Sequence, residues 1–200
     1  NLNNRQRDHG RPLKPQVLQP PLESATPDAT GRPITRGEHM DQAERHIEEE
    51  LYRSAVELIE RRYPTGWGGA AAMRLVGRDS SKHGGNDDSE ALIVTSVAIE
   101  TANAAASLCI EVGAMCEAMK LDRRVTHTIC VVRDDEHAPF TVLSPCGICQ
   151  ERLRYWGDDV MCAVSDNNQG KRPLFVPLRD LQPHHWTQSY PPTELEHYKG

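Results

Sequence analysis

The sequence lacks the features that mark membrane, secreted and nucleic-acid-binding proteins. No apolar run approaches the roughly 20 residues that a membrane span needs, and no apolar core typical of a signal peptide lies near the N-terminus. There is no excess of positive charge either, since the 200 residues carry a formal net charge of -6 at pH 7. A large nucleic-acid interface needs a basic face. We therefore expect a cytoplasmic protein without a membrane contact, and the charge argues against a nucleic-acid partner.

Cysteine is too sparse for a disulfide scaffold. Six cysteines in 200 residues fall well below the density of small disulfide-rich domains. Two of them, Cys146 and Cys149, form one C-x-x-C motif, which in an intracellular protein indicates metal or redox chemistry first. The sequence also has no internal repeat, coiled coil or phosphate-binding loop. With 38% hydrophobic and 26% charged residues, it suits a globular protein.

The composition divides the chain into a domain with an extension at each end. Residues 1–38 hold few large apolar side chains and several of the 14 prolines, namely Pro12, Pro15, Pro20, Pro21, Pro27 and Pro33. Such a segment cannot bury enough surface to offset the entropy of ordering it, so we predict a disordered extension; the alternative is an arm packed on a neighbouring subunit. We predict a folded domain over 39–186 and a loose polar tail over 187–200.

Hydrophobic periodicity in 39–186 predicts strands that alternate with helices. The helices are expected at 42–62, 107–120, 147–156 and 177–181. The strands are expected at 68–76, 91–97, 128–132, 140–143, 160–164 and 174–176, with a long polar loop at 77–90 inside a hairpin. This alternation predicts a layered α/β domain with a mixed or mostly parallel sheet.

Two short stretches supply three thiols and one carboxylate: Cys109-Ile110-Glu111 and Pro145-Cys146-Gly147-Ile148-Cys149. A catalytic zinc ion takes three protein ligands and leaves the fourth position for water, whereas a structural zinc ion is normally closed by four. Three cysteines with a glutamate two residues after the first therefore favour an open zinc site with a proton-transferring group beside it.

The predicted helices explain why this spacing suits a metal. Cys109 and Cys146 each fall at the expected start of a helix, where free N–H groups and the helix dipole stabilise a thiolate. Cys146 and Cys149 are three residues apart and face the same way in a first helical turn. Glu111 is only two residues from Cys109, so it is expected to stay outside the coordination sphere and point at the open position.

Less specific interpretations remain at this point. Cys116 lies seven residues, about 10 Å along a helix, from Cys109 and is too far to share its ion. A fourth ligand for a structural zinc site could instead be His127, His184 or His185, and a redox C-x-x-C is a further alternative. The remaining apolar elements predict core side chains at Cys116, Cys130, Cys162, Met115 and Met119, and His184-His185 is expected to be a solvated pair.

From about residue 47 to 186 the chain resembles the single-domain, tetrameric cytidine deaminases and their relatives, the blasticidin S deaminases. The family's C-A-E and P-C-G-x-C motifs stand here as C-I-E and S-P-C-G-I-C. The resemblance implies a three-layer α/β/α fold with a central mixed sheet, a Zn²⁺ cofactor, a homotetramer and a small cytosine-type substrate. It also implies that Cys109, Cys146 and Cys149 bind zinc and that Glu111 is the catalytic proton shuttle.

Weaker matches indicate how a substrate would be held. Trp67 falls at the position of an aromatic residue that packs near the base, and Glu100 at the family's acidic ribose-binding position. The family's ribose-binding asparagine is Ala98 here, and the arginine that often follows C-A-E is Val112. The resemblance implies hydrolysis of cytidine or deoxycytidine to the uracil-type product and ammonia. Because alanine cannot hydrogen-bond a sugar, the alternatives are a modified nucleoside or an antibiotic such as blasticidin S, and a non-catalytic zinc-stabilised module.

Overall fold

The computed structural model describes residues 42–77, 91–165 and 173–194. The expected N-terminal extension at 1–38 and nearly all of the expected loop at 77–90 lie outside these residues. None of the described helices is long and apolar enough to cross a membrane.

The described strands form one mixed sheet of six strands in the order β2-β1-β3-β5-β6, with β4 paired to β3. Their bounds are Gly68–Gly77 (β1), Leu92–Ser96 (β2), Arg123–Arg133 (β3), Thr141–Leu143 (β4), Met161–Val164 (β5) and Leu174–Pro177 (β6). Among the described pairs only β3 and β5 run parallel. The expected mixed sheet is thereby confirmed, and the alternative of a mostly parallel sheet is wrong.

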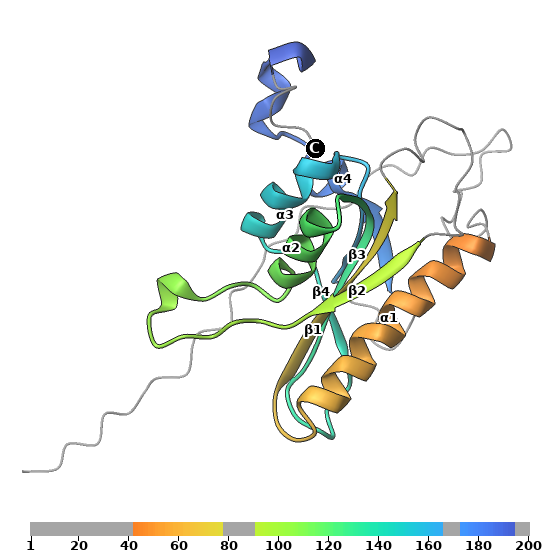
Figure 1. Cartoon of the computed structure of the whole chain (residues 1–200), viewed down its shortest axis with the longest axis vertical. Coiled ribbons are helices and arrows are strands. Elements are labelled where there is room, and N and C mark those ends of the chain that lie inside the picture. Colours follow the sequence, from red (N-terminus) through yellow and green to blue (C-terminus); the bar gives the residue numbers. More distant parts are fainter. Residues whose placement is uncertain (1–41, 78–90, 166–172, 195–200) are drawn as a thin grey trace, which may run out of the picture. The chain divides into compact units, whose positions relative to one another are not determined.

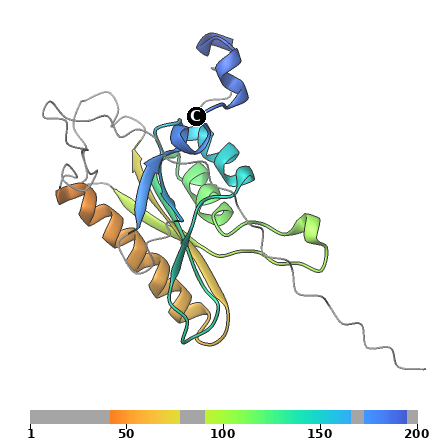
Figure 2. The same ribbon diagram turned by 180° about the vertical axis from the view of Figure 1, so that it is seen from behind.

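Three helices cover the two faces of this sheet (Figures 1 and 2). Helix α1 (Gln42–Arg62) packs on one face, where its Leu51, Ala55 and Ile59 meet Ala70 and Ala72 of β1. Helices α2 (Val112–Lys120) and α3 (Gly147–Leu153) pack on the other, against core residues that include Met73 and Leu75 of β1. Neighbouring strand residues point to opposite faces, so the apolar strand β1 serves both cores and the expected three-layer α/β/α arrangement is confirmed.

Shorter elements complete the chain. The 3₁₀ turns are Ala104–Ala106 (η4), Arg154–Trp156 (η5), Trp186–Ser189 (η6) and Pro192–Glu194 (η7), and helix α4 spans Leu178–Leu181. Turns η6 and η7 lie in the stretch for which we predicted a loose tail, so its described part has local structure. The boundaries 1–38, 39–186 and 187–200 stay predictions.

Helix α2 begins five residues later than the sequence predicted. Instead of a helix from 107, residues 99–108 form a narrow loop between β2 and α2, which extends away from the sheet in Figure 1. Ile99 and Leu108 close this loop through an antiparallel bridge. At its tip the Asn103 side chain accepts a hydrogen bond from the Ala105 amide, which starts η4 in place of α2. The apolar spacing from 107 to 111 therefore belongs to a bridge and a turn.

A polar network ties the first turn of α1 to the sheet. His127 of β3 is buried, and its Nε2 lies 2.7 Å from Glu44 Oε1 while its Nδ1 lies 3.0 Å from Thr126 Oγ1. Arg74 of β1 donates to the same Thr126 hydroxyl at 3.2 Å. The hydrogen bond from His127 holds the pKa of Glu44 below its ordinary value. An ionised Glu44 thus stabilises the contact between α1 and β3.

We predict that Glu44→Gln lowers the free energy of unfolding by about 0.5–1 kcal/mol at pH 7, a modest value because about a third of the Glu44 side chain is exposed. A carboxyl group with a lowered folded-state pKa stabilises the fold above its unfolded pKa of about 4.3 and loses that contribution as the pH falls through the folded value. Urea unfolding should therefore show a difference between wild type and variant at pH 7 that shrinks below about pH 4.

The matched control is Glu57→Gln, which removes an exposed carboxylate from the same helix. It should change the unfolding free energy by less than about 0.5 kcal/mol. A difference for Glu44→Gln that stayed constant down to pH 3 would contradict the role given to the ionised carboxylate.

Candidate metal centre

Three cysteine side chains converge where α2 and α3 begin. The Sγ atoms of Cys109, Cys146 and Cys149 all lie within 4.8 Å of one another, and those of Cys109 and Cys146 are 3.5 Å apart. All three thiols are free. Within residues 42–77, 91–165 and 173–194, no other group of three or more His, Cys, Asp or Glu side chains is arranged to hold a metal ion.

The start of α3 presents two of these thiols in one direction. Cys146 occupies the N-cap position with extended backbone, and the Gln150 amide donates to its carbonyl at 2.8 Å, which closes the first turn. Burial opposes ionisation of Cys146, but the amides of Cys149 and Ile148 donate to its sulfur and its pKa is lowered overall. Cys149 lies three residues on, buried in the same turn. The predicted geometry of the C-x-x-C motif is thus present.

The position of Cys109 differs from the prediction. It lies three residues before α2 rather than in the first turn, and its carbonyl accepts a hydrogen bond from the Val112 amide at 3.1 Å. The next residue, Ile110, is anchored to β2 because its carbonyl accepts a hydrogen bond from the Ser96 hydroxyl. A Cβ on Gly113 would lie 2.8 Å from Ser96 Cβ, so α2 starts in close contact with β2. The sheet, not the helix, therefore fixes Cys109.

Glu111 occupies the N-cap position of α2 and is only 5% exposed. Its carboxylate makes no capping bond and no hydrogen bond to any residue that the structure describes. Burial raises the pKa of Cys149, and the negative charge of Glu111 is the next largest cause. Burial followed by the same charge raises the pKa of Cys162 to about 12. The unbonded carboxylate is therefore near enough to these thiols for its charge to oppose their ionisation.

The donor set fits a divalent metal ion. Burial, followed by the hydrogen bond with Cys146, raises the pKa of Cys109, and the charge of Glu111 adds to this. Thiols that oppose one another's ionisation gain most from a cation between them, and zinc accepts three thiolate ligands with tetrahedral geometry. Glu111 is not part of the ligand cluster. Three sulfur ligands leave a fourth position open.

Of the three histidines considered as a fourth ligand, His184 is exposed, as expected, and lies outside the cysteine cluster, while the other two have partners of their own. His127 bonds Glu44 and Thr126 on the α1 side of the sheet. His185 Nε2 lies 2.7 Å from Glu151 Oε2, and its side chain is only 6% exposed, so the expectation of a solvated histidine pair is wrong for His185. Neither histidine belongs to the cysteine cluster. The described part of the chain therefore offers three ligands rather than a closed set of four.

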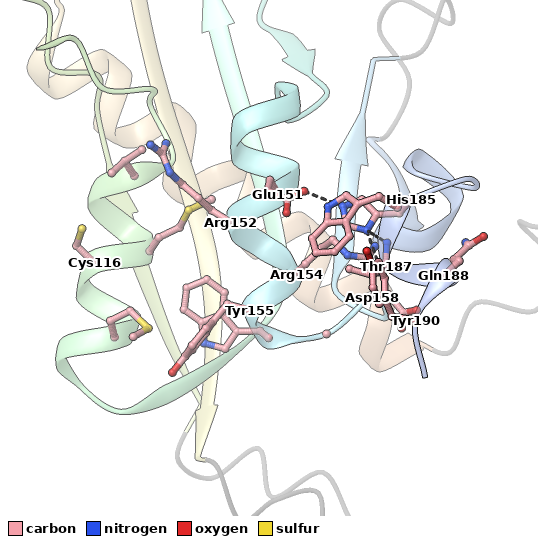
Figure 3. A pocket seen from close by; sticks show the side chains of 16 residues that line it. Cys116, Glu151, Arg152, Arg154, Tyr155, Asp158, His185, Thr187, Gln188 and Tyr190 are labelled. Carbon is pink, nitrogen blue, oxygen red and sulfur yellow. Dashed lines mark hydrogen bonds and ion pairs between the residues drawn. The ribbon is translucent and has the colours of Figure 1, made fainter. Parts of the chain in front are cut away.

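Two of the predicted core side chains on α2 are wrong. Cys130, Cys162 and Met115 are buried as expected, but Met119 is 49% exposed and Cys116 is exposed as well. Both side chains line a groove of about 1410 Å³ that α2 forms with α3, η5 and η6. Figure 3 shows the groove from close by; a dashed line marks the hydrogen bond between Glu151 of α3 and His185. The three clustered cysteines and Glu111 do not line it.

The three predicted substrate-binding positions lie in two different places. Trp67 is 44% exposed just before β1. A Cβ on Gly69 would lie 2.8 Å from Ile110 Cδ1 and 3.1 Å from Trp67 Cη2, so the indole and Ile110 meet over Gly69, one residue from Glu111. Ala98 and Glu100 lie on the segment that leaves β2, where Glu100 is exposed and has no ion pair within the described residues. Trp67 thus approaches the segment that carries the cysteine and glutamate at Ile110, whereas the segment with Ala98 and Glu100 joins it through the bridge of Ile99 to Leu108, the residue before Cys109.

Sequence reasoning missed the residues that anchor these segments. Ser96 holds Ile110, as described above. Ser144 and Ser165 exchange hydrogen bonds of 3.1 and 2.9 Å between amide and hydroxyl and fix the segment that enters Cys146. Each pair joins residues far apart in the chain, and no local spacing marks them.

Solved structures similar to this chain are cytidine deaminases. The enzyme from Bacillus anthracis is 45% identical, with 76% of this chain and 97% of that chain covered and a TM-score of 0.65. The enzyme from Mycobacterium tuberculosis is 22% identical (73% and 98% covered, TM-score 0.45), and that from Mycobacterium leprae is 18% identical (68% and 96% covered, TM-score 0.46). No protein-family model matches the chain, and no curated protein matches it.

We predict that the purified protein carries about one zinc ion per chain and that Cys146→Ser lowers its zinc affinity by more than about 100-fold, since loss of a direct ligand costs more than the 10–100-fold loss of a supporting residue. Atomic emission after gel filtration, with chelator competition, measures both quantities. Cys116→Ser is the matched control, because this exposed thiol lies outside the cluster. Equal zinc loss in both variants would contradict the assignment.

Proposed function

Because this chain belongs to the cytidine deaminase family, we propose that it hydrolyses cytidine or deoxycytidine to the uracil-type nucleoside and ammonia. The identity of 45% over 97% of the Bacillus anthracis enzyme supports this family, which the two motifs had predicted. The observation that carries the proposal is the cluster of three free cysteines together with the buried Glu111, which has no hydrogen bond to a described residue. It is the arrangement a zinc-dependent hydrolytic deaminase needs.

Cys109, Cys146 and Cys149 would hold the zinc ion. When bound, zinc supplies a Lewis acid that makes water a stronger acid near neutral pH. The start of α3 holds Cys146 and Cys149, and the Ser96 anchor holds the segment with Cys109, in a fixed arrangement before the ion arrives. This arrangement limits the reorganisation that metal binding requires.

Glu111 would move the proton. It lies outside the ligand cluster and is 5% exposed, with no hydrogen bond to a described residue that would compete for its carboxylate oxygens. It takes a proton from the attacking water and gives it to the amino nitrogen, which leaves as ammonia. The hydroxyl group left on the ring carbon loses its proton to the neighbouring ring nitrogen and becomes the oxo group. A positioned acid–base group of this kind contributes about 10²–10⁴-fold to the rate.

Trp67 would contact the pyrimidine ring, because its indole meets Ile110 beside Glu111 and remains half-exposed. Glu100 would accept hydrogen bonds from the ribose hydroxyls. Ala98 offers no group for this purpose, and this favours a second candidate substrate: a modified nucleoside or a cytosine-containing antibiotic such as blasticidin S. The same deamination chemistry applies to the plain nucleosides and to this second candidate, since only the group attached to the cytosine ring differs.

A homotetramer is part of the proposal. The groove between α2, α3 and η6 has exposed apolar walls that include Met119, Trp186 and Tyr190, and apolar surfaces of this kind mark protein–protein contacts. The six free cysteines suit a reducing compartment such as the cytoplasm.

Ammonia release by the zinc-loaded protein tests the reaction against cytidine, deoxycytidine, cytosine, deoxycytidine monophosphate and blasticidin S. Turnover of the two plain nucleosides is the expected result. Turnover of the antibiotic alone would replace the first substrate by the second. No turnover in the presence of bound zinc would contradict the proposed function.

Glu111→Gln should keep its zinc and lose at least about 10²-fold in kcat, because an amide cannot accept and return the proton. Glu117→Gln is the matched control on the same helix, since Glu117 pairs with Lys120 at the surface. It should retain kcat within about twofold. A Glu111→Gln enzyme close to wild type in kcat would contradict the role of the carboxylate.

Met119→Glu should weaken the tetramer, because it places a charge on the apolar wall of the groove. Light scattering during gel filtration should then show a smaller species at micromolar concentration. Lys120→Glu introduces the same carboxylate one residue along, outside the groove, and should leave the mass unchanged. Equal masses for wild type and Met119→Glu would exclude this surface as the subunit contact.

A further inference from the structure

We propose that Arg133 and Glu136 are positioning residues for substrate binding, because they hold the turn that presents Trp67. The inference rests on the proposed function in one respect, namely that Trp67 contacts the substrate ring. It assigns a role to two charged residues that neither bind the metal nor transfer a proton.

The turn at 63–67 has little structure of its own. It begins where the Tyr63 amide makes the last hydrogen bond of α1, to Ile59 at 2.8 Å, and it ends at Trp67, one residue before β1. Pro64 has no N–H to donate, and Gly66 has a φ of +73°, a left-handed conformation that favours glycine. Contacts from elsewhere must therefore keep this turn in one conformation.

Both contacts come from the end of β3 and the loop that follows it. Glu136 Oε2 accepts a hydrogen bond from the Gly66 amide at 2.7 Å, and the Arg133 guanidinium donates through Nη2 to the Tyr63 carbonyl. Each contact joins residues 70 positions apart in the chain. The turn is thus held at two backbone groups, one on either side of Pro64-Thr65.

The two anchors are themselves held firmly. Arg133 is the last residue of β3, is 6% exposed, and has its guanidinium 5.6 Å from the centre of the Phe140 ring. Glu136 follows Asp135, whose Oδ1 accepts hydrogen bonds from the amides of His137 and Ala138 at 2.8 and 3.0 Å. The loop therefore offers the Glu136 carboxylate from a fixed backbone. Because the Gly66 amide also lowers the pKa of Glu136, the group stays ionised at neutral pH.

Movement of the turn would reach the candidate active site directly. The Trp67 ring lies edge-on to Tyr63, with centroids 6.2 Å apart, and its far end meets Ile110 over Gly69. Ile110 immediately precedes Glu111. The loop that carries Glu136 continues through β4 to Pro145 and Cys146, so the same contact joins the Trp67 turn to the segment that supplies two thiols.

Glu136→Ala is the decisive variant, because Glu136 is exposed and its removal should not impair folding. Loss of one charge-assisted hydrogen bond should raise KM for the nucleoside about two- to tenfold while kcat changes less than twofold. Glu136→Gln retains an acceptor oxygen, so its KM should lie close to the wild-type value. Asp134→Ala, in the same exposed loop and without a bonded partner among the described residues, is the matched control. Arg133→Lys should behave like Glu136→Ala, because lysine lacks the planar fork that reaches the carbonyl from above Phe140.

Acrylamide quenching of tryptophan fluorescence gives a readout that needs no substrate. In a Trp186→Phe background the quenchable signal comes mainly from Trp67, since Trp156 is buried. Glu136→Ala should raise the quenching constant about twofold, and Glu136→Gln and Asp134→Ala should leave it near the background value.

The outcomes separate this inference from the proposed function. An unchanged quenching constant in Glu136→Ala would overturn the inference, whatever the substrate. A raised constant with an unchanged KM would overturn it too, because Trp67 would then move without consequence for binding. A wild-type enzyme inactive on pyrimidine nucleosides would overturn the proposed function, and quenching would then decide alone whether the two residues hold Trp67. The inference is supported if Glu136→Ala raises both the quenching constant and KM and if Glu136→Gln keeps both near their wild-type values.

Discussion

The fold holds close together three thiols and a carboxylate that would repel one another if all were ionised. Three thiols lie within 4.8 Å of one another, and the buried carboxylate of Glu111 is near enough for its charge to raise the pKa of Cys149. In their ionised forms these groups repel, and burial makes the repulsion stronger. A divalent cation turns this unfavourable cluster into a stable one, and it does so only if the thiols are held in place. The fold therefore has to deliver them from two segments 37 residues apart.

The layers of the domain meet this requirement in different ways. On one face of the sheet, α1 and its network around His127 and Glu44 supply stability without touching the site. On the other, both segments reach the metal centre where a helix begins, anchored by serine side chains of the sheet and its loops. The turn before Trp67 is held in the same manner by Glu136. Anchored backbone segments thus surround a site whose reactive side chains make few hydrogen bonds themselves.

The local motifs predicted the metal centre because short spacing fixes which side chains share a turn. The fold class could be predicted as well, because the spacing of apolar residues differs between helices and strands. Periodicity did not show how much of α2 would be covered, so it predicted Cys116 and Met119 in a core that on this helix includes Val112, Ala114, Met115 and Ala118. It also placed the start of α2 too early, since it cannot distinguish a bridge between Ile99 and Leu108 from a helical turn. Contacts such as Glu136 with Gly66 depend on the tertiary fold, and no spacing in the sequence announces them.

X-ray absorption at the zinc edge would show whether the metal site is open, because it counts the atoms around the metal. An open site built from this cluster predicts three sulfur atoms at about 2.3 Å and one oxygen atom at about 2.0–2.2 Å. Addition of a nucleoside analogue that carries a hydroxyl group at the reacting carbon should change the oxygen contribution and leave the three sulfurs in place. Four protein ligands, with a fourth sulfur or an imidazole nitrogen that persists when the analogue is added, would contradict the account.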